Sequence, residues 1–129
     1  MEKMEIRRFD VLLVDLAGAV GSEQKKIRPC VVVGNDMSNR FSPVLLVMPL
    51  THVNKKAHIP THKYIKKEVG SGLTTDSTLI GEQPTPIDRQ RIKEKLGKIS
   101  NKASQDMIDQ ACYEAFFYKK ETQGEGSAV

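Results

Sequence analysis

The sequence has no tryptophan and few aromatic residues of any kind, with four phenylalanines and three tyrosines among its 129 residues. It also lacks a long apolar run. The longest, at residues 44–50, is far shorter than the ~20 residues that a membrane-spanning helix needs. Residues 1–8 are charged and contain no apolar stretch of the kind found in secretory signals. We therefore expect a cytoplasmic protein.

Cysteine is also scarce, and its positions exclude the usual cysteine chemistry. Cys30 and Cys112 lie far apart and match no metal-binding or redox spacing, so we expect two reduced, buried thiols. A chain of this length can bury a core large enough to fold without a metal or a disulfide. The net charge of +4 and the pI of about 9.1 permit a polyanionic partner without requiring one.

Stretches rich in β-branched and aliphatic residues predict five short strands, at residues 11–16, 30–34, 44–50, 59–65 and 77–83. The third is apolar on both faces, which favours a central position in the sheet. Pro60 makes the fourth an edge candidate, because proline cannot donate to a strand ladder. We expect a polar connection at residues 35–43 and a break in regular structure at Pro84 and Pro86.

The clearest periodic signal lies near the C-terminus, where apolar residues from Ala103 to Phe116 recur with the 3.6-residue period of a helix. Ser100 or Asn101 can cap this helix. Residues 88–98 fit either a helix or a strand. We expect one mostly-β domain over residues 1–120, a small bent antiparallel barrel or sandwich with a packed helix, and a disordered polar tail over residues 121–129.

The segment 21–29 reads G-S-E-Q-K-K-I-R-P and resembles the G-S-E-Q-x-x-x-R-P signature of the MazF/PemK toxin family. It follows a predicted strand that ends in V-D-L, as the family signature does. Other blocks follow in the family's order: V-V-G-N-D at 32–36, N-R-F-S-P at 39–43, P-L-T at 49–51, P-T-H at 60–62, D-S at 76–77, and E-Q and I-D within 82–88. The match runs from about residue 7 to 118. A lone G-S-E-Q would be weak, but the ordered set is specific.

The sequence departs from the family pattern at two places. Residues 8–10 read R-F-D where the family usually has R-G-D, which predicts an altered turn at the entry to the first strand. Residues 82–88 read E-Q-P-T-P-I-D where the family has E-Q-x-R-T-I-D. The family arginine is therefore Thr85 here, with a proline on each side. This second departure concerns sequence preference or a dimer contact more than the chemistry.

The resemblance implies an SH3-like small barrel with a C-terminal α-helix, in which residues 88–91 form a short helical turn and 92–98 a strand. It also implies a homodimer with RNA lying in a groove along the dimer interface. The implied activity is that of an endoribonuclease that cleaves single-stranded mRNA at specific short sequences without a cofactor. A free ribonuclease would harm its host, so the resemblance further implies an antitoxin partner of the MazE kind.

RNA can be cleaved without a metal because its 2′-OH can attack the adjacent phosphate, leaving a 2′,3′-cyclic phosphate and a 5′-OH. The protein must then accept a proton, stabilise the phosphorane and donate a proton. Arg28 suits phosphate stabilisation, although it could instead form an ion pair with Asp36 or Glu23. Thr51 can hold a phosphate oxygen or the 2′-OH, or can simply be a strand-end threonine. Glu23 is the candidate general base, or else an exposed loop carboxylate.

Five further residues make up the predicted RNA-binding set: Ser22, Gln24, His62, Glu82 and Gln83. His62 can stack on a base or contact a phosphate. Glu82 and Gln83 can read base edges, which single-stranded RNA leaves exposed. A chain with so few aromatic side chains must specify its sequence mainly through hydrogen bonds.

Three alternatives are weaker. The three histidines do not predict a zinc site, because no cysteine or carboxylate set completes one. A gyrase-binding toxin of the CcdB kind would share the fold, but Arg28 and Thr51 argue against it because a toxin that only binds does not need them. A catalytically degenerate nucleic-acid-binding module is kept open by Thr85 and its flanking prolines.

Overall fold

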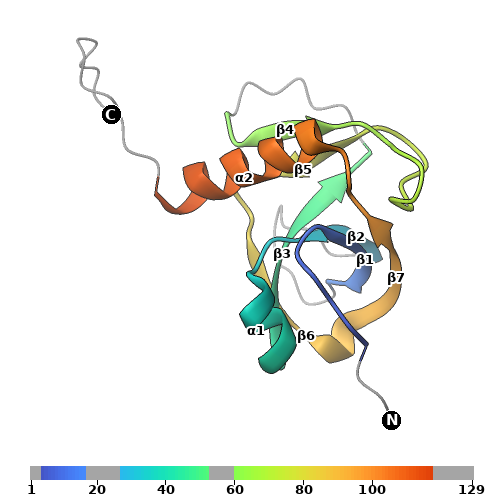
Figure 1. The fold of residues 1–129 in the computed structure, drawn as a ribbon, viewed down its shortest axis with the longest axis vertical. Helices are drawn as coiled ribbons and strands as arrows, with labels where there is room; N and C mark the ends of the chain where they lie inside the picture. Colours follow the sequence, from blue (N-terminus) through green and yellow to red (C-terminus); the bar gives the residue numbers. More distant parts are fainter. Residues whose placement is uncertain (1–3, 17–26, 53–59, 118–129) are drawn as a thin grey trace.

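The computed structural model describes residues 4–16, 27–52 and 60–117 (Figure 1). The strands are β1 (Asp10–Asp15), β2 (Ile27–Val32), β3 (Val44–Thr51), β4 (His62–Ile65), β5 (Ser77–Ile80), β6 (Thr85–Asp88) and β7 (Ile92–Lys98). The helices are α1 (Asp36–Phe41), the 3₁₀ turn η1 (Arg89–Arg91) and α2 (Lys102–Phe116). The predicted tail over residues 121–129 lies outside the described residues.

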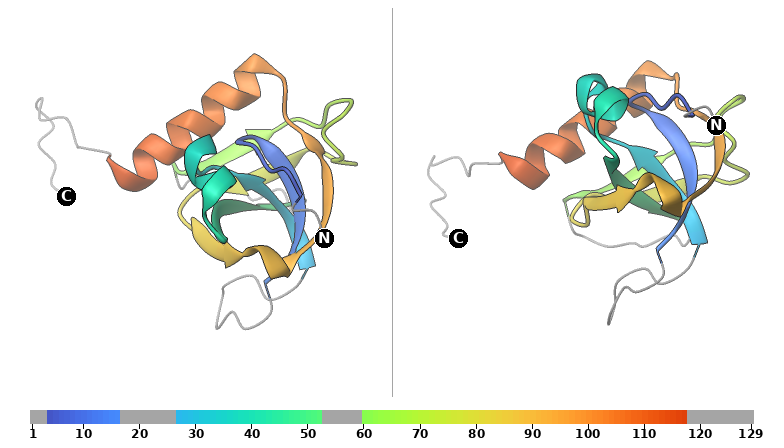
Figure 2. Two further views of the ribbon diagram at one scale, coloured as in Figure 1. Left: turned by 60° about the horizontal axis from the view of Figure 1, so that its bottom comes forward. Right: turned by 90° about the horizontal axis from the view of Figure 1, so that it is seen from below.

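All the described strands pair antiparallel in the order β4-β5-β3-β2-β1-β7, and β6 pairs with β3. β3 is central, as predicted: β2 lies along one edge, while β6 and then β5 lie along the other. β4 is an edge strand, also as predicted. Viewed from below, the sheet curls into a small barrel-like fold that does not close (Figure 2). The prediction of a mostly-β domain with a C-terminal helix is confirmed.

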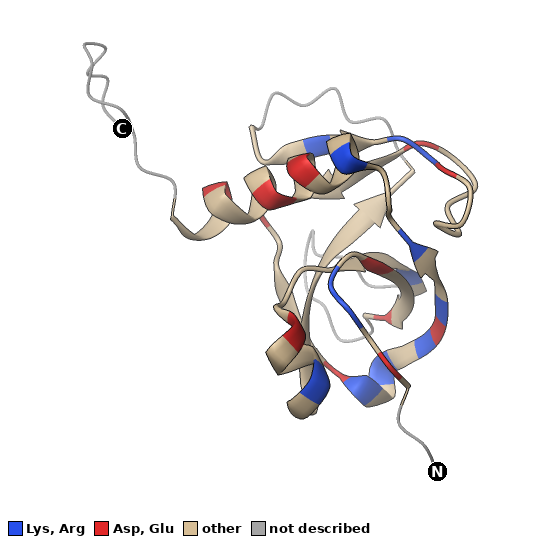
Figure 3. Ribbon diagram, viewed as in Figure 1, with Lys and Arg blue, Asp and Glu red and all other residues tan. Residues whose placement is uncertain are grey.

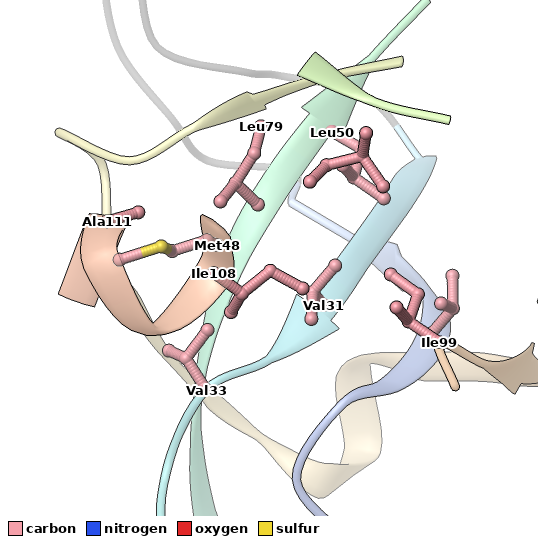
Figure 4. Close-up of a cluster of buried hydrophobic side chains, with 10 residues drawn as sticks. Val31, Val33, Met48, Leu50, Leu79, Ile99, Ile108 and Ala111 are labelled. Atoms are coloured by element: carbon pink, nitrogen blue, oxygen red, sulfur yellow. The ribbon is translucent and has the colours of Figure 1, made fainter. Parts of the chain in front are cut away.

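Alternate residues of the central strands feed two separate cores. Val31 and Met48 belong to a cluster beneath α2, in which Leu79 and Ile108 point toward one another (Figure 4). Cys30, between Val31 and Pro29 in β2, belongs to a second cluster on the opposite face of the sheet. Each fully buried aliphatic side chain stabilises the fold by roughly 1.5–3 kcal/mol relative to its exposed state. The sheet is therefore apolar on both faces at its centre.

Helix α2 begins as the sequence predicted. Asn101 is its N-cap, and its side chain accepts a hydrogen bond from the Ser104 N–H at 3.0 Å. The carboxylate of Glu68 accepts from the N–H groups of Ser100 and Asn101, which anchors the start of the helix to the loop before β5. Near its other end, Glu114 forms a 3.0 Å ion pair with Lys63 of β4. The helix is thus tied at both ends to the β4–β5 hairpin that it covers (Figure 1).

Two elements contradict the sequence predictions. Residues 36–41, expected to be a polar connection, form α1, because Asn35 caps it by accepting from the Ser38 N–H at 2.8 Å. Residues 85–88, expected to be broken by prolines, form β6 and pair with the first half of β3. Pro86 is tolerated because β6 pairs with β3 alone, so its other edge needs no donor.

The segment that sequence patterns left open, residues 88–98, contains both elements that the family resemblance implied. Asp88 caps η1 by accepting from the Gln90 N–H at 2.8 Å, and β7 follows directly. β5 is shorter than predicted and ends at Ile80, where the Gln83 N–H turns back to the Ile80 carbonyl at 3.1 Å. Lysine and arginine residues are frequent along β7 and η1 (Figure 3).

The entry turn before β1 holds Phe9, which stands where the family usually has glycine, in a conformation that favours glycine. The Asp10 N–H donates to the Arg7 carbonyl at 3.0 Å, which closes a four-residue turn. Phe9, the third residue of this turn, has a φ of 77°, which a type II turn requires at that position and which favours glycine. The phenylalanine ring packs partly against the core beneath α2 and lies 4.7 Å from the Arg8 guanidinium carbon. Backbone strain is thus retained alongside side-chain packing.

We predict that Phe9→Gly will be more stable than Phe9→Ala, although both will be less stable than the wild type. Both variants lose the ring, but only glycine relieves a left-handed conformation that costs an L-residue roughly 1–2 kcal/mol. The difference should be about 1 kcal/mol in urea denaturation at one protein concentration. Val44→Gly and Val44→Ala on β3 are the matched control pair and should show the reverse order. Equal or reversed stability at Phe9 would contradict the strain.

Candidate functional site

The strand register brings Arg28 and Thr51 together. β2 and β3 pair antiparallel with Cys30 opposite Pro49, and continuing this register by two residues places Arg28 opposite Thr51. Directly opposed residues of an antiparallel pair share a face, with Cβ atoms about 4.5–5.5 Å apart. Thr51 is 5% exposed, so the surrounding strands fix its position. Continued in this way, the register directs the two residues predicted to carry the chemistry to the same face at the same end of the sheet.

The same face of the sheet also carries His62. Thr51 is opposite Thr78 of β5, and Thr78 is opposite Tyr64 of β4. His62 precedes Tyr64 by two residues in the same strand, so it shares the face of Tyr64 and of Arg28. One predicted RNA-binding residue thus lies on the same sheet face as the predicted catalytic pair.

Glu82 is held against His62. Its carboxylate lies 2.8 Å from Nε2 of His62 and accepts a 3.1 Å hydrogen bond from the Thr61 hydroxyl. The close approach of the segment before Glu82 to Thr61 requires glycine at position 81, because a Cβ there would overlap the Thr61 carbonyl oxygen. Sequence analysis had not singled out Thr61 or Gly81, although Thr61 stands inside the P-T-H block. The arrangement fixes a carboxylate in one orientation beside a histidine.

The Glu82 carboxyl is easier to ionise than an ordinary one. Burial, the largest influence, acts to raise its pKa. The hydrogen bonds from His62, its own backbone N–H and Thr61, together with the charge of His62, outweigh burial and lower the pKa. Glu82 is therefore an ionised hydrogen-bond acceptor at neutral pH.

A pocket of about 550 Å³ lies beside Arg28 at the ends of β2 and β3. Its lining residues are Ile27, Arg28, Pro29, Leu50, His52, Gly72, Leu73, Thr74, Thr75 and Ser77. Arg28 Nε is buried without a hydrogen-bond partner among the described residues, which is uncommon for a buried polar atom. No carboxylate is among the described residues that line this pocket. An anion with oxygen acceptors would satisfy both features.

The ion pair between Arg28 and Asp36 that the sequence allowed does not form. Asp36 instead accepts hydrogen bonds from the Arg8 N–H at 2.7 Å and from the Asn39 side chain at 3.1 Å. The Arg8 N–H is the main cause of a lowered Asp36 pKa. Asp36 opens α1, beyond the end of β2 opposite to the one that carries Arg28. The Asp36 carboxylate therefore binds Arg8 and Asn39 instead of Arg28.

The signature-loop residues Ser22, Glu23 and Gln24 lie outside the described residues, so their roles stay predictions. Gln83 is described, and its carbonyl accepts a 2.9 Å hydrogen bond from the Thr85 hydroxyl. Where the family has an arginine, this chain therefore has Thr85, a short side chain that donates a hydrogen bond to the main-chain carbonyl of Gln83. Thr85 lies opposite Val47, in the half of β3 remote from Thr51.

The cysteines and the charged groups give no sign of metal chemistry in the part of the chain that the structure describes. No group of three or more potential ligands occurs among those residues. Cys30 and Cys112 are free, as predicted, with Cys30 buried and Cys112 half-buried. Burial raises the pKa of Cys30 to about 12, so it remains a neutral thiol. No helix over the described ranges is long and apolar enough to cross a membrane.

We predict that Glu82→Gln will reduce the acid sensitivity of the fold. The folded-state pKa of Glu82 lies below its ordinary value of 4.5, so ionised Glu82 stabilises the fold above that pH, and this contribution is lost as pH falls through the folded-state pKa. Urea midpoints measured between about pH 3 and 7 should therefore fall less steeply on the acid side in the variant. Glu94→Gln on the exposed side of β7 is the matched control. Parallel curves for wild type and Glu82→Gln would contradict this role.

Comparison with known proteins agrees with the fold and identifies the family. A family model described as "PemK-like, MazF-like toxin of type II toxin-antitoxin system" matches residues 7–114. A protein named Endoribonuclease MazF, from Staphylococcus saprophyticus, is 42% identical over 102 residues, covering 79% of this chain and 84% of the relative.

Two solved structures share the fold at low sequence identity. MazF from Deinococcus radiodurans aligns with a TM-score of 0.71 at 16% identity, covering 88% of this chain and 94% of the other. An endoribonuclease in complex with its cognate antitoxin, from a mycobacterial species, aligns with a TM-score of 0.70 at 19% identity, covering 90% and 99%. With the family match over most of its length, the chain belongs to the PemK-like, MazF-like toxins of type II toxin–antitoxin systems.

Proposed function

We propose that this chain is the toxin of a type II toxin–antitoxin pair and a metal-independent, sequence-specific endoribonuclease. Its substrate is single-stranded mRNA, and its products carry 2′,3′-cyclic phosphate and 5′-OH ends. The observation that carries the proposal is the β2–β3 register, which, continued by two residues beyond Cys30 and Pro49, directs Arg28 and Thr51 to one sheet face. The 42% identity to a protein named Endoribonuclease MazF supports it.

The proposed chemistry assigns one task to each of three residues. Arg28 binds the scissile phosphate, and its planar, permanently charged guanidinium stabilises the phosphorane. Its unpartnered Nε supports this, because a phosphate oxygen would supply the missing acceptor. Thr51 donates a hydrogen bond that holds the phosphate or the 2′-oxygen in line. Glu23 accepts the proton of the 2′-OH.

Sequence recognition is assigned to the polar groups farther along the sheet face. Glu82, oriented by Thr61 and His62, accepts hydrogen bonds from base N–H donors. Gln83 can both donate and accept, and Ser22 and Gln24 complete the set. These groups read base edges in a single strand, where stacking and pairing do not hide them.

The proposed assembly is a homodimer in the cytoplasm, where its mRNA substrate is found. A relative of the same fold has been solved in complex with its cognate antitoxin, which supports a MazE-like partner. An acidic, apolar antitoxin segment suits the net charge of +4 and the pocket beside Arg28, whose described lining residues include no carboxylate. Such a segment would exclude RNA from Arg28 while bound.

We predict that purified protein will cut a long, unstructured RNA at discrete sites in EDTA and leave 5′-OH ends. Arg28→Ala should slow cleavage by about 10²–10³-fold, because it removes one transition-state stabiliser. Thr51→Ala should cost roughly 10–10²-fold, the range for a hydrogen bond to a charged group. The readouts are single-turnover rates and mapping of the 5′ ends.

Arg7→Ala is the matched control, because it removes one exposed arginine paired with Glu5 in the N-terminal segment. It should cleave at the wild-type rate. Cleavage by Arg28→Ala at the same rate would contradict the mechanism. Intact RNA combined with gyrase inhibition would favour a CcdB-like toxin, and RNA binding without cleavage would favour a degenerate module.

A further inference from the structure

The pair formed by Arg28 and Thr51 leaves one step of the proposed cleavage without a residue. When the bond between phosphorus and the 5′-oxygen breaks, the leaving oxygen needs a proton. Arginine keeps its proton at neutral pH, and a threonine hydroxyl is a weaker acid still at that pH. Glu23 is assigned to accept the 2′-OH proton. The inference below rests on the proposed function and concerns the missing donor.

His52 lines the pocket beside Arg28, where a proton donor for the leaving oxygen could act. It directly follows Thr51 at the end of β3, and it lines the same 550 Å³ pocket as Arg28. Its side chain is exposed, so a substrate can reach it. The remaining residues that line the pocket are apolar, glycine, or carry hydroxyl groups. His52 is thus the one described group there whose type gains and loses a proton near neutral pH.

The other described histidine is placed differently. Nε2 of His62 lies 2.8 Å from the Glu82 carboxylate, and its side chain is only 9% exposed. Its strand, β4, is separated from β2 by both β3 and β5. His62 is therefore suited to orienting Glu82, not to contacting the leaving group beside Arg28.

We propose that His52 is the general acid of the cleavage reaction. The 2′-oxygen forms a bond to phosphorus as Glu23 takes its proton. The bond between phosphorus and the 5′-oxygen then breaks, its electron pair stays on that oxygen, and the His52 imidazolium supplies the proton. The RNA atoms are only rearranged, so no co-reactant is consumed, and exchange with solvent restores both side chains.

Among the described residues, the groups that face His52 from the neighbouring elements carry few charges. Arg28 on β2 is the charged group that faces the pocket. The segment before β5 and β5 itself contribute only uncharged residues to the lining, among them Thr74, Thr75 and Ser77. The next carboxylate along the chain, Asp76, is engaged by the Lys67 N–H at 2.9 Å and by the Tyr64 hydroxyl at 2.8 Å.

The decisive experiment changes the leaving group. An oligonucleotide containing the mapped site is made with the natural 5′-oxygen and with sulfur in its place, since a thiolate leaves without being protonated. On the oxygen substrate, His52→Ala should be slowed about 10²-fold or more, the usual contribution of a general acid. On the sulfur substrate, the variant and the wild type should differ by less than about threefold, because the donor is no longer needed. Both rates are measured in single turnover with enzyme in excess.

Two further readouts separate a proton donor from a binding residue. The wild-type rate on the oxygen substrate should fall as pH rises through the range in which imidazole loses its proton, and His52→Gln should lack that fall. His62→Ala should weaken RNA binding but keep both the pH profile and the difference between oxygen and sulfur substrates.

Each outcome bears on a specific claim. A His52→Ala defect of equal size on both substrates, or no defect on the oxygen substrate, would overturn the assignment to His52 while leaving the ribonuclease intact. Failure of the wild type to cut any RNA would instead overturn the proposed function, and the role of His52 with it.

Discussion

The register between β2 and β3 is the constraint on which both the core and the candidate site depend. Successive residues of β2 are committed to different cores, Val31 to the cluster beneath α2 and Cys30 to the cluster on the other face. A slip of one residue would exchange these faces and put side chains that fit one core into the other, where the packing of residues that each stabilise the fold by roughly 1.5–3 kcal/mol would be lost. The packing of the two cores therefore also places Arg28 on the same face as Thr51. The polar site needs no interactions of its own to be aligned.

Arg8 performs a comparable task for the helices. Its guanidinium donates to the Val33 carbonyl at 3.0 Å and to Asp109 at 2.6 Å, and its N–H donates to Asp36 at 2.7 Å. The N-terminal segment, the end of β2, α1 and α2 thus meet at one residue. Burial acts to lower the Arg8 pKa, but Asp109 and Cys112 outweigh it and raise the pKa, so the charge is permanent. The strained turn at Phe9 is retained next to this junction.

The sequence predicted those parts of the fold whose signal is local and repeated. The 3.6-residue period of α2 extends over several turns, and the apolar strand at 44–50 is one continuous run, so both could be predicted. The cap of α2 could be narrowed to Ser100 or Asn101. The six residues of α1 are too few to show a period, and β6 contains a proline that only its edge position makes acceptable. The contact of Glu82 with His62 joins residues twenty positions apart and depends on Gly81. The order of the family motifs in the sequence pointed to the candidate site residues. The strand register was needed to show which of these residues share a face of the sheet.

In the proposed assignment, the residues for chemistry and those for recognition lie at different places along the sheet. The register directs Arg28 and Thr51 to one cross-strand row, which reaches β4 at Tyr64. His62 precedes Tyr64 by two residues in β4 and holds Glu82. Thr85 stands opposite the first half of β3 and bonds to the Gln83 carbonyl, beside the recognition groups and away from the Arg28 row. A substitution there can change which bases are read without moving the phosphate-binding pair. The loss of the family arginine is therefore compatible with retained cleavage of a different RNA sequence.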